Sequence, residues 1–355
     1  MYIRKISSEI TMNKPLCALT MGDPSGIGPE IILKTVYSER ANNAAHMVVI
    51  GYPEPFIRDR KLLDLDCELR IIDSPRTFNE KEKTLQLLIP QTSIDVPAGY
   101  GILDKSCGQA AALCIELSAQ LALNGDIDAV VTAPINKESL NMAGYHYPGH
   151  TEFYQSLAGA EDIAMMLTLG NFRVIHVVTH TAIRHVPDMI TQERIVRVTS
   201  LMHDALILLG IQHPELAVSG LNPHAGESGL FGKEEIEEIL PAVEKMKAAG
   251  IHITGPLPPD TVFARAYSGE FDGVVAMFHD QGHIALKLAG FKFRESAREI
   301  GGVNTTLGLP IIRTSVDHGT AFDIAGKGIA SPLSMIEAVE MAAVLAGGKK
   351  KARSG

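Results

Sequence analysis

Three histidines of this sequence follow apolar segments at comparable places. His180 comes after VIHVVT, His224 lies in LNPHAGE, and His279 lies in MFHDQG. One histidine in such a place is more often structural than functional, but three in polar loops favour a shared metal ion. Imidazole suits Zn, Co, Ni or Fe, and three protein ligands leave a coordination position for a substrate. The sequence therefore predicts a metal site, provided that the fold brings the three rings together.

A second group of residues could hold an anion. Lys287, Asn304 and Arg313 supply an ammonium, an amide and a guanidinium within residues 274–328. Arginine suits bidentate contact with carboxylate or phosphate, and lysine acts as a point charge. For each of them a surface position or a structural ion pair is the alternative. That alternative is weakest for Arg313, which closes the apolar run 309–312, because a charge there is costly unless it lies at a strand end or has a partner.

The segment YHYPGHTEFY adds His150 and Thr151 to these candidates. We expect Thr151 to cap the helix formed by TEFYQSLAG, so that both residues project from a helix N-terminus, where anions bind well. Lys137 follows an expected strand, and a solvated lysine at a helix start is the alternative to a functional role. Asp260 lies in GPLPPDT at an expected helix start. We take Lys137 and Asp260 as candidates for proton transfer.

The elements that must position these residues are predicted from apolar runs and helical periodicity. The run 274–278 is typical of a buried strand, and His279 follows it at the end where ligands bind in open α/β sheets. Strands alternate with helices, which predicts an α/β protein with a largely parallel sheet in two lobes and chain crossings between them. The expected strands are 16–20, 47–51, 69–72, 129–132, 164–169, 172–178, 216–219, 251–254 and 274–278, and the main expected helices lie near 53–65, 110–121, 191–209, 233–249 and 331–345, with Pro241 breaking or kinking the fourth.

The glycine-rich segment MGDPSGIGPE, residues 21–30, joins the first expected strand to the first helix. Gly22, Gly26 and Gly28 allow a tight loop with close backbone approach. Their spacing fits neither the dinucleotide fingerprint GxGxxG nor the phosphate loop GxxxxGK[ST]. A structural turn and a ligand loop both remain open for this segment.

Bulk properties narrow the class of protein. The chain has 355 residues, a hydrophobic content of 46% and a formal net charge of -9, which argues against nucleic acid as a partner. No apolar run reaches about 20 residues, so we expect no membrane span. The four cysteines form no CxxC pair and are expected to be buried free thiols in a cytoplasmic protein. We expect an N-terminal extension over 1–14 that lacks the core of a signal peptide, one two-lobed unit over 15–348, and a solvated basic tail over 349–355.

Several blocks occur in order from about Leu16 to the last expected helix: MGDPSGIGPE, PGHTEF, GLNPHAGE, GPLPPDT, HDQG, GVNTTLGLP and RTSVDHGTA. On these blocks the chain resembles the 4-hydroxythreonine-4-phosphate dehydrogenase family, metal- and NAD-dependent enzymes of pyridoxal phosphate synthesis. The resemblance implies an isocitrate/isopropylmalate dehydrogenase-like fold and a homodimer whose active site lies between the subunits.

The resemblance also implies roles for individual residues. His180, His224 and His279 match the ligands of one divalent metal ion (Zn, Co or Mg), with His279 supplied by the partner subunit. The implied substrate-binding residues are His150, Thr151, Lys287, Asn304 and Arg313.

The segment HGTAFDIAGKG resembles the adenine-binding loop of isopropylmalate dehydrogenases. The resemblance implies that His318, Gly319, Thr320 and Asp323 bind NAD. An acidic residue at the position of Asp323 would accept a hydrogen bond from the ribose 2′-hydroxyl and repel a 2′-phosphate. We therefore expect NAD rather than NADP.

The chain departs from the vitamin-pathway members in the longer insert KFRESAREIG, near residues 291–300. This pattern is more similar to a second branch, which resembles the dehydrogenases of 4-phospho-D-threonate and 4-phospho-D-erythronate. The implied reaction is oxidation of the substrate's C3 hydroxyl by NAD, followed by decarboxylation to a three-carbon keto phosphate. The alternatives are the same reaction on 4-phosphohydroxy-L-threonine, a dihydrodiol dehydrogenase, and a non-enzymatic protein that binds phosphorylated metabolites.

Overall fold

The computed structural model describes residues 14–80, 84–294 and 297–354, and only the backbone between residues 291 and 300. Nearly all of the extension expected over 1–14 therefore lies outside the described residues. Among the described residues, no helix combines the length and apolarity needed to cross a membrane. The four cysteines are buried free thiols, as expected.

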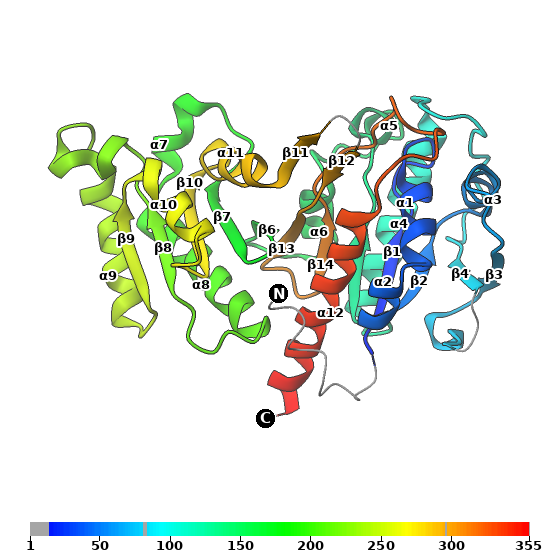
Figure 1. Ribbon diagram of the computed structural model, residues 1–355, viewed down its shortest axis with the longest axis horizontal. Coiled ribbons are helices and arrows are strands. Elements are labelled where there is room, and N and C mark those ends of the chain that lie inside the picture. The colour runs from blue at the N-terminus through cyan, green and yellow to red at the C-terminus, as the bar shows by residue number, and fades with distance from the viewer. Residues whose placement is uncertain (1–13, 81–83, 295–296, 355) are drawn as a thin grey trace.

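One sheet of 12 strands runs through both lobes of the molecule, in the order β3-β4-β2-β1-β5-β14-β13-β6-β7-β10-β8-β9 (Figure 1). The strands 16–20, 129–132, 164–169, 172–178 and 216–219 have the predicted bounds. The strands of this sheet are β1 (Leu16–Thr20), β2 (His46–Ile50), β3 (Glu68–Ile72), β4 (Thr84–Leu88), β5 (Ala129–Thr132), β6 (Ala164–Leu169), β7 (Phe172–Val178), β8 (Leu216–Ser219), β9 (Ile253–Leu257), β10 (Gly273–Phe278), β13 (Val303–Leu307) and β14 (Arg313–Val316).

The chain crosses between the lobes in the middle of this sheet. It leaves the first lobe after β5 and returns through β13 and β14, and β14 pairs in parallel with β5. β13 pairs antiparallel with both β14 and β6, and β6 pairs antiparallel with β7. The remaining ladders of the sheet are parallel. The prediction of an α/β protein with a largely parallel sheet and chain crossings is thus confirmed.

Helices cover both faces of the sheet (Figure 1). In the second lobe, Val275 and Met277 of β10 pack with α8 and α9, whereas Val274 and Ala276 pack with α10 and α11. Burial of both faces explains why β10 reads as a continuous apolar run. The helices are α1 (Gly28–Val36), α2 (Glu39–Ala44), α3 (Pro53–Leu62), α4 (Lys105–Leu123), α5 (Lys137–Met142), α6 (His150–Ala158), α7 (Val186–Met189), α8 (Gln192–Leu208), α9 (Leu240–Ala248), α10 (Pro259–Tyr267), α11 (His279–Gly290) and α12 (Leu333–Ser354).

The insert KFRESAREIG forms most of an antiparallel hairpin of β11 (Phe291–Arg294) and β12 (Ala297–Ile300), separate from the main sheet. Pro241 does not break the fourth expected helix. Helical structure runs without interruption through a π-helical turn, Glu235–Ile239, into α9, whose second residue is Pro241. The irregularity next to the proline is this π-helical turn.

The end of the chain differs from the prediction. Gly347 and Gly348 do not stop the last helix, because α12 runs on to Ser354. A Cβ on Gly348 would come within 2.2 Å of the Leu208 carbonyl oxygen, so the glycine lets α12 pass close to the end of α8. Lys349 then donates a hydrogen bond to the Pro310 carbonyl at 2.6 Å, and Lys350 pairs with Asp128 at 2.8 Å. The basic tail is therefore partly bound to the protein rather than wholly solvated.

Candidate active site

Arg313 is the buried cation of the candidate site. It begins β14 and is only 2% exposed. Its Nη2 donates to Thr132 Oγ1 at 2.6 Å, and its Nη1 donates to Thr306 Oγ1 at 3.0 Å and to Thr151 Oγ1 at 3.5 Å. Burial lowers the pKa of Arg313 to about 10, so the side chain still carries its charge near neutral pH. Its hydrogen bonds within the described chain thus go to neutral hydroxyls, and a buried charge with neutral partners is suited to bind an anion.

His150 is the first residue of α6 and lies next to this guanidinium. Its Nε2 atom is buried and has no hydrogen-bond partner among the described residues. Burial, and then the charge of Arg313, hold the pKa of His150 well below its ordinary value, so the ring is neutral and can donate or accept. Gly149 is the N-cap of α6 and offers no side-chain cap to the first backbone N–H groups. A helix N-terminus, an imidazole and a guanidinium therefore meet at one place.

The capping role expected for Thr151 is wrong. α6 begins one residue earlier, at His150, because extended Gly149 takes the N-cap position. Thr151 lies inside the first turn, and its hydroxyl accepts the hydrogen bond from Arg313. The residue belongs to the anion site through this contact instead of through the helix cap.

The predicted metal histidines follow three neighbouring strands. His180 comes after β7, His224 after β8 and His279 after β10, and β10 lies between the other two in the sheet. The rings of His180 and His279 are 5.8 Å apart. His224 lies in the turn Pro223–Gly229, where its ring is 6.4 Å from that of Phe231. Within the described part of one chain, no three His, Cys, Asp or Glu side chains form a group that could hold a metal ion.

His180 and His279 each place one ring nitrogen, Nδ1, next to a carboxylate, as metal-binding histidines commonly do. The Nδ1 atom of His279 is 2.7 Å from Asp280 Oδ1, and that of His180 is 3.4 Å from Glu152 Oε1. When Nδ1–H donates to a carboxylate, Nε2 is left as the ligand atom, and ligating histidines are commonly oriented in this way. His180 and His279 therefore suit a divalent ion, and the convergence of His224, or of a residue from a second subunit, stays a prediction.

Two further histidines, which the sequence analysis did not place in the site, lie against this pair. The ring of His283 stacks on that of His279 at 3.7 Å, and His176 lies 4.7 Å from His283. Burial lowers the pKa of His176 to about 3, and burial followed by the charge of His279 lowers that of His283 to about 4. The spacing HDQGH could have revealed His283, because it lies four residues after His279 on one helix.

A cavity of about 270 Å³ is lined by the first turn of α6, at Thr151 and Glu152, and by His176 and His180. A second cavity of about 220 Å³ is lined by His180 and His279. Thr179 and His180 line both cavities. The first is lined by Thr151, Glu152, Met165, His176, His180 and Arg194, among others, and the second by His180, His279 and Asp280, among others.

The remaining substrate and proton-transfer candidates are placed as follows. Asn304 donates to Met165 Sδ at 2.9 Å, while its buried Oδ1 has no hydrogen-bond partner among the described residues. Lys287 pairs with Asp317 at 2.7 Å. Lys137 is exposed at the first position of α5, and its charge contributes to the lowered pKa of Glu152. Asp260 is exposed in the first turn of α10 and lines neither cavity.

The segment that begins at His318, which the resemblance implies is the nucleotide-binding loop, packs against the glycine-rich segment 21–30. Ile27 N–H donates to the Thr320 carbonyl at 3.1 Å, and a Cβ on Gly26 would come within 3.0 Å of Thr320. A Cβ on Gly22 would come within 2.3 Å of the Pro134 carbonyl oxygen, and one on Gly28 within 2.2 Å of that of Met21. These contacts favour the structural-turn interpretation of residues 21–30, which support the loop that follows His318.

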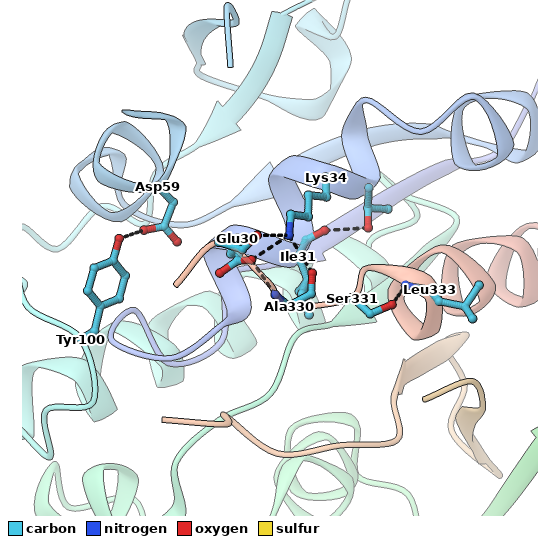
Figure 2. A network of polar contacts seen from close by, with 10 residues as sticks. Glu30, Ile31, Lys34, Asp59, Tyr100, Ala330, Ser331 and Leu333 are labelled. Atoms are coloured by element: carbon cyan, nitrogen blue, oxygen red, sulfur yellow. Dashed lines mark hydrogen bonds and ion pairs between the residues drawn. The ribbon is translucent and has the colours of Figure 1, made fainter. Parts of the chain in front are cut away.

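A polar network on α1 anchors the far end of this loop (Figure 2). Lys34 Nζ donates to the carbonyls of Ala330 at 2.7 Å and Gly328 at 3.0 Å. The buried Glu30 carboxylate accepts from Lys34 at 2.7 Å and from Ala330 N–H at 2.8 Å. The His318 Nδ1 atom lies 3.0 Å from the Gly319 carbonyl. The segment is thus tied to the glycine-rich segment at Thr320 and to α1 at Gly328 and Ala330.

Comparisons with known proteins agree with this architecture. The family described as pyridoxal phosphate biosynthetic protein PdxA matches residues 43–342. The D-threonate 4-phosphate dehydrogenase of Pectobacterium atrosepticum is 45% identical over 335 residues, which cover 93% of this chain and 99% of the relative. The 4-hydroxythreonine-4-phosphate dehydrogenase of Geobacter metallireducens is 43% identical and covers 94% of this chain and 96% of its own.

A solved structure extends the similarity to the fold. The crystal structure of 4-hydroxythreonine-4-phosphate dehydrogenase from Klebsiella pneumoniae has a TM-score of 0.80 and 43% identity. It covers 95% of this chain and 99% of the solved chain. The chain therefore belongs to the family of pyridoxal phosphate biosynthetic protein PdxA.

Proposed function

We propose that this protein oxidises the C3 hydroxyl of a 4-phosphorylated hydroxy acid with NAD and a divalent metal ion, followed by decarboxylation to a three-carbon keto phosphate. The preferred substrates are 4-phospho-D-threonate or 4-phospho-D-erythronate. The observation that carries the proposal is the buried Arg313, whose partners are the hydroxyls of Thr132, Thr151 and Thr306. A phosphate at the start of α6 would supply the negative charge that these partners lack.

The relatives support a phosphorylated substrate and a dehydrogenase reaction. The Pectobacterium relative is named for D-threonate 4-phosphate and the Geobacter relative for 4-hydroxythreonine 4-phosphate. Both substrates carry a phosphate at C4 and a hydroxyl at C3, and they differ at C2, which bears a hydroxyl in the first and an amino group in the second. The amino substrate is therefore the second candidate. A dihydrodiol that carries neither a phosphate nor a carboxylate would leave Arg313 without an anion, which disfavours a neutral diol as the substrate.

The metal would be held by His180, His224 and His279, in a homodimer with a shared active site. A bound divalent ion supplies Lewis acidity, which lowers the pKa of the substrate hydroxyl. Glu152 and Asp280 orient His180 and His279 by accepting their Nδ1–H groups. Asn304 would direct its free Oδ1 toward a substrate hydroxyl.

Proton transfer is assigned to Lys137 rather than Asp260. Lys137 stands at the start of α5, where its charge acts on Glu152, a residue of the cavity wall. Asp260 lies on α10, exposed to solvent and outside both cavities. A lysine at the reacting hydroxyl would act in general acid–base catalysis.

The nucleotide would lie along residues 318–330, with Asp323 accepting a hydrogen bond from the ribose 2′-hydroxyl. His318, Gly319 and Thr320 begin this loop next to the glycine-rich segment. A 2′-phosphate would be repelled by the carboxylate, which favours NAD over NADP.

The test of this function is NADH formation at fixed protein and metal, with 4-phospho-D-threonate, 4-phospho-D-erythronate and 4-phosphohydroxy-L-threonine compared side by side. Preference for the first two supports the proposal. Preference for the third assigns the amino substrate instead. No reaction with any of them, in a protein shown to bind metal, would contradict a phosphorylated substrate.

A further inference from the structure

The turn that carries His224 has an unusual backbone. All five residues from His224 to Ser228 have φ between 42° and 78°, in the left-handed region. Four of them carry a Cβ, which disfavours this conformation. These four are among only seven non-glycine residues with positive φ in the described chain. Backbone of this kind persists only where the surrounding structure holds it in place.

The Glu235 carboxylate lies directly beneath this turn. Its Oε1 accepts hydrogen bonds from the backbone N–H groups of Leu221 at 2.8 Å and Asn222 at 2.7 Å. Its Oε2 accepts a hydrogen bond from Asn222 Nδ2 at 2.9 Å. Glu235 is 3% exposed, and a Cβ on Gly226 would come within 2.6 Å of its Oε2. The carboxylate therefore fixes the backbone that enters the turn and fills the space below it.

The position of Glu235 depends on a local irregularity of its helix. It is the first residue of the π-helical turn ahead of α9. Single π-helical turns occur frequently at functional sites, where the extra residue redirects a side chain. Glu235 is thereby turned into the protein under the histidine turn.

Gln281 links the same region to the strand that leads to His279. Its Oε1 accepts the Met277 N–H at 2.7 Å, and its Nε2 donates to the Gly220 carbonyl at 2.8 Å. Gly220 directly follows β8, and Met277 lies near the end of the adjacent β10. One amide group thus ties the backbone that leads from β8 into the His224 turn to the adjacent strand β10.

We propose that Glu235 is a positioning residue for His224: its carboxylate holds the left-handed turn in the conformation from which the imidazole binds a divalent metal ion. This inference rests on the metal site of the proposed function. Without the carboxylate, the turn relaxes toward right-handed conformations and His224 leaves its place at the end of β8.

The experiment uses the full-length, metal-free protein and its Glu235→Gln variant. Co²⁺ affinity is measured by competition with a chromogenic chelator, together with the visible spectrum of the Co²⁺ form and the thermal unfolding of the metal-free form. We expect Glu235→Gln to bind Co²⁺ about 10–100-fold more weakly, as loss of an outer-shell partner does. We also expect altered Co²⁺ bands at saturation and a Tm of the metal-free protein close to that of the wild type.

The matched control is Glu238→Gln. Glu238 lies in the same π-helical turn and also accepts a backbone N–H, that of Gln192 at 2.6 Å, but this hydrogen bond leads to α8. Its Co²⁺ affinity and spectrum should equal those of the wild type. A positioning role further predicts partial recovery of affinity in Glu235→Gln when Ala225 is replaced by glycine, because glycine adopts the left-handed region without a Cβ penalty.

The outcomes separate this inference from the metal site itself. If wild-type protein binds no Co²⁺, the proposed metal site is wrong. If wild type binds and folded Glu235→Gln binds equally with the same spectrum, the positioning role is overturned while the metal site stands. Glu235→Asp is measured in parallel, since it keeps the charge but withdraws the carboxylate; weaker Co²⁺ binding supports the role and unchanged binding contradicts it, even if Glu235→Gln does not fold.

Discussion

The Nδ1 atom of His180 lies 3.4 Å from Oε1 of Glu152, and this contact joins the anion site to the histidines. Glu152 follows His150 and Thr151 in the first turn of α6, so the turn that faces Arg313 also reaches the end of β7. The contact with His180 is the main cause of the lowered pKa of the Glu152 carboxyl. An anion at the start of α6 and a metal on His180 would therefore be coupled through one residue.

Replacing Glu152 should weaken the binding of metal more than it weakens the fold. Glu152→Ala leaves the Nδ1 of His180 without its carboxylate, and we expect about 10–100-fold weaker metal affinity. Glu152→Gln keeps an acceptor oxygen and should recover part of the loss. Isothermal titration with Zn²⁺ measures both variants, and equal affinity of Glu152→Ala and wild type would count against the coupling.

Each predicted metal ligand can be removed in turn. His180→Ala, His224→Ala and His279→Ala should each lose bound metal and dehydrogenase activity, because three ligands form the proposed site. Metal content after dialysis, measured by atomic emission, is compared with His203→Ala on α8. If all three single variants keep a full metal complement, the assignment of these histidines is wrong.

Arg313→Met should separate substrate binding from stability. Loss of a buried partner of an anion costs about 2–5 kcal/mol, so kcat/KM for the phosphorylated substrate should fall about 30- to 5,000-fold. The variant also removes a buried charge that has no ion-pair partner in the described part of the chain, so the Tm of the ligand-free protein should not fall.

Inorganic phosphate gives a direct check on Arg313. It should raise the Tm of the wild type, because a ligand that binds only the folded chain stabilises it, and it should leave Arg313→Met unchanged. Arg40→Met is the control, since Arg40 is an exposed partner of Glu340. A phosphate-dependent rise in the Tm of Arg313→Met would place the anion elsewhere.

The nucleotide preference can be changed at Asp323. Asp323→Lys removes the acceptor for the ribose 2′-hydroxyl and adds a partner for a 2′-phosphate. We expect kcat/KM to shift from NAD toward NADP, measured with each nucleotide at saturating substrate. Unchanged preference would show that the ribose lies away from this residue.

Acid should destabilise the protein through two histidines, the buried His176 and the half-buried His283. The pKa of His176 is lowered to about 3 and that of His283 to about 4, whereas both rings take up protons below about 6.5 in the unfolded chain. The unfolded state therefore binds more protons in this window, and the free energy of unfolding should fall as the pH decreases from 6.5 toward 4. The free energy of unfolding is measured by urea titration at each pH. Its slope against pH should be shallower for His283→Gln than for the wild type, by the equivalent of up to one proton. A slope equal to that of the wild type would contradict the neutral, half-buried state of His283.

The sequence predicted the strands that are buried on both faces, because they read as apolar runs. Leu16–Thr20 and Phe172–Val178 have the expected bounds for this reason. The sequence did not predict β4, β13 and β14, and the last two carry polar side chains, including Asn304 and Arg313. Helix ends were less predictable. The start of α6 depends on the extended backbone of Gly149, and the length of α12 depends on the close packing of Gly348 against Leu208. Neither the conformation of Gly149 nor the packing of Gly348 can be inferred from the neighbouring residues in the sequence.

Within the site, the sequence identified residue types but not their partners. That Arg313 would bond to hydroxyls from β5, β13 and α6 depends on the strand order across the lobes. Glu152 and Glu235 escaped the sequence analysis because their roles come from tertiary contacts with His180 and with the backbone at Leu221. The family resemblance implied which histidines bind the metal. The side chains that contact these histidines or their backbone, such as Glu152 and Glu235, can be found only in the fold.

The unbroken sheet has a mechanical consequence. From β3 to β9 the two lobes are joined by one hydrogen-bonded ladder, and Arg313 lies on β14, close to its midpoint. A clamshell hinge at the seam would have to break main-chain hydrogen bonds. Relative motion of the lobes that preserves these hydrogen bonds must therefore take the form of twisting or bending of the sheet.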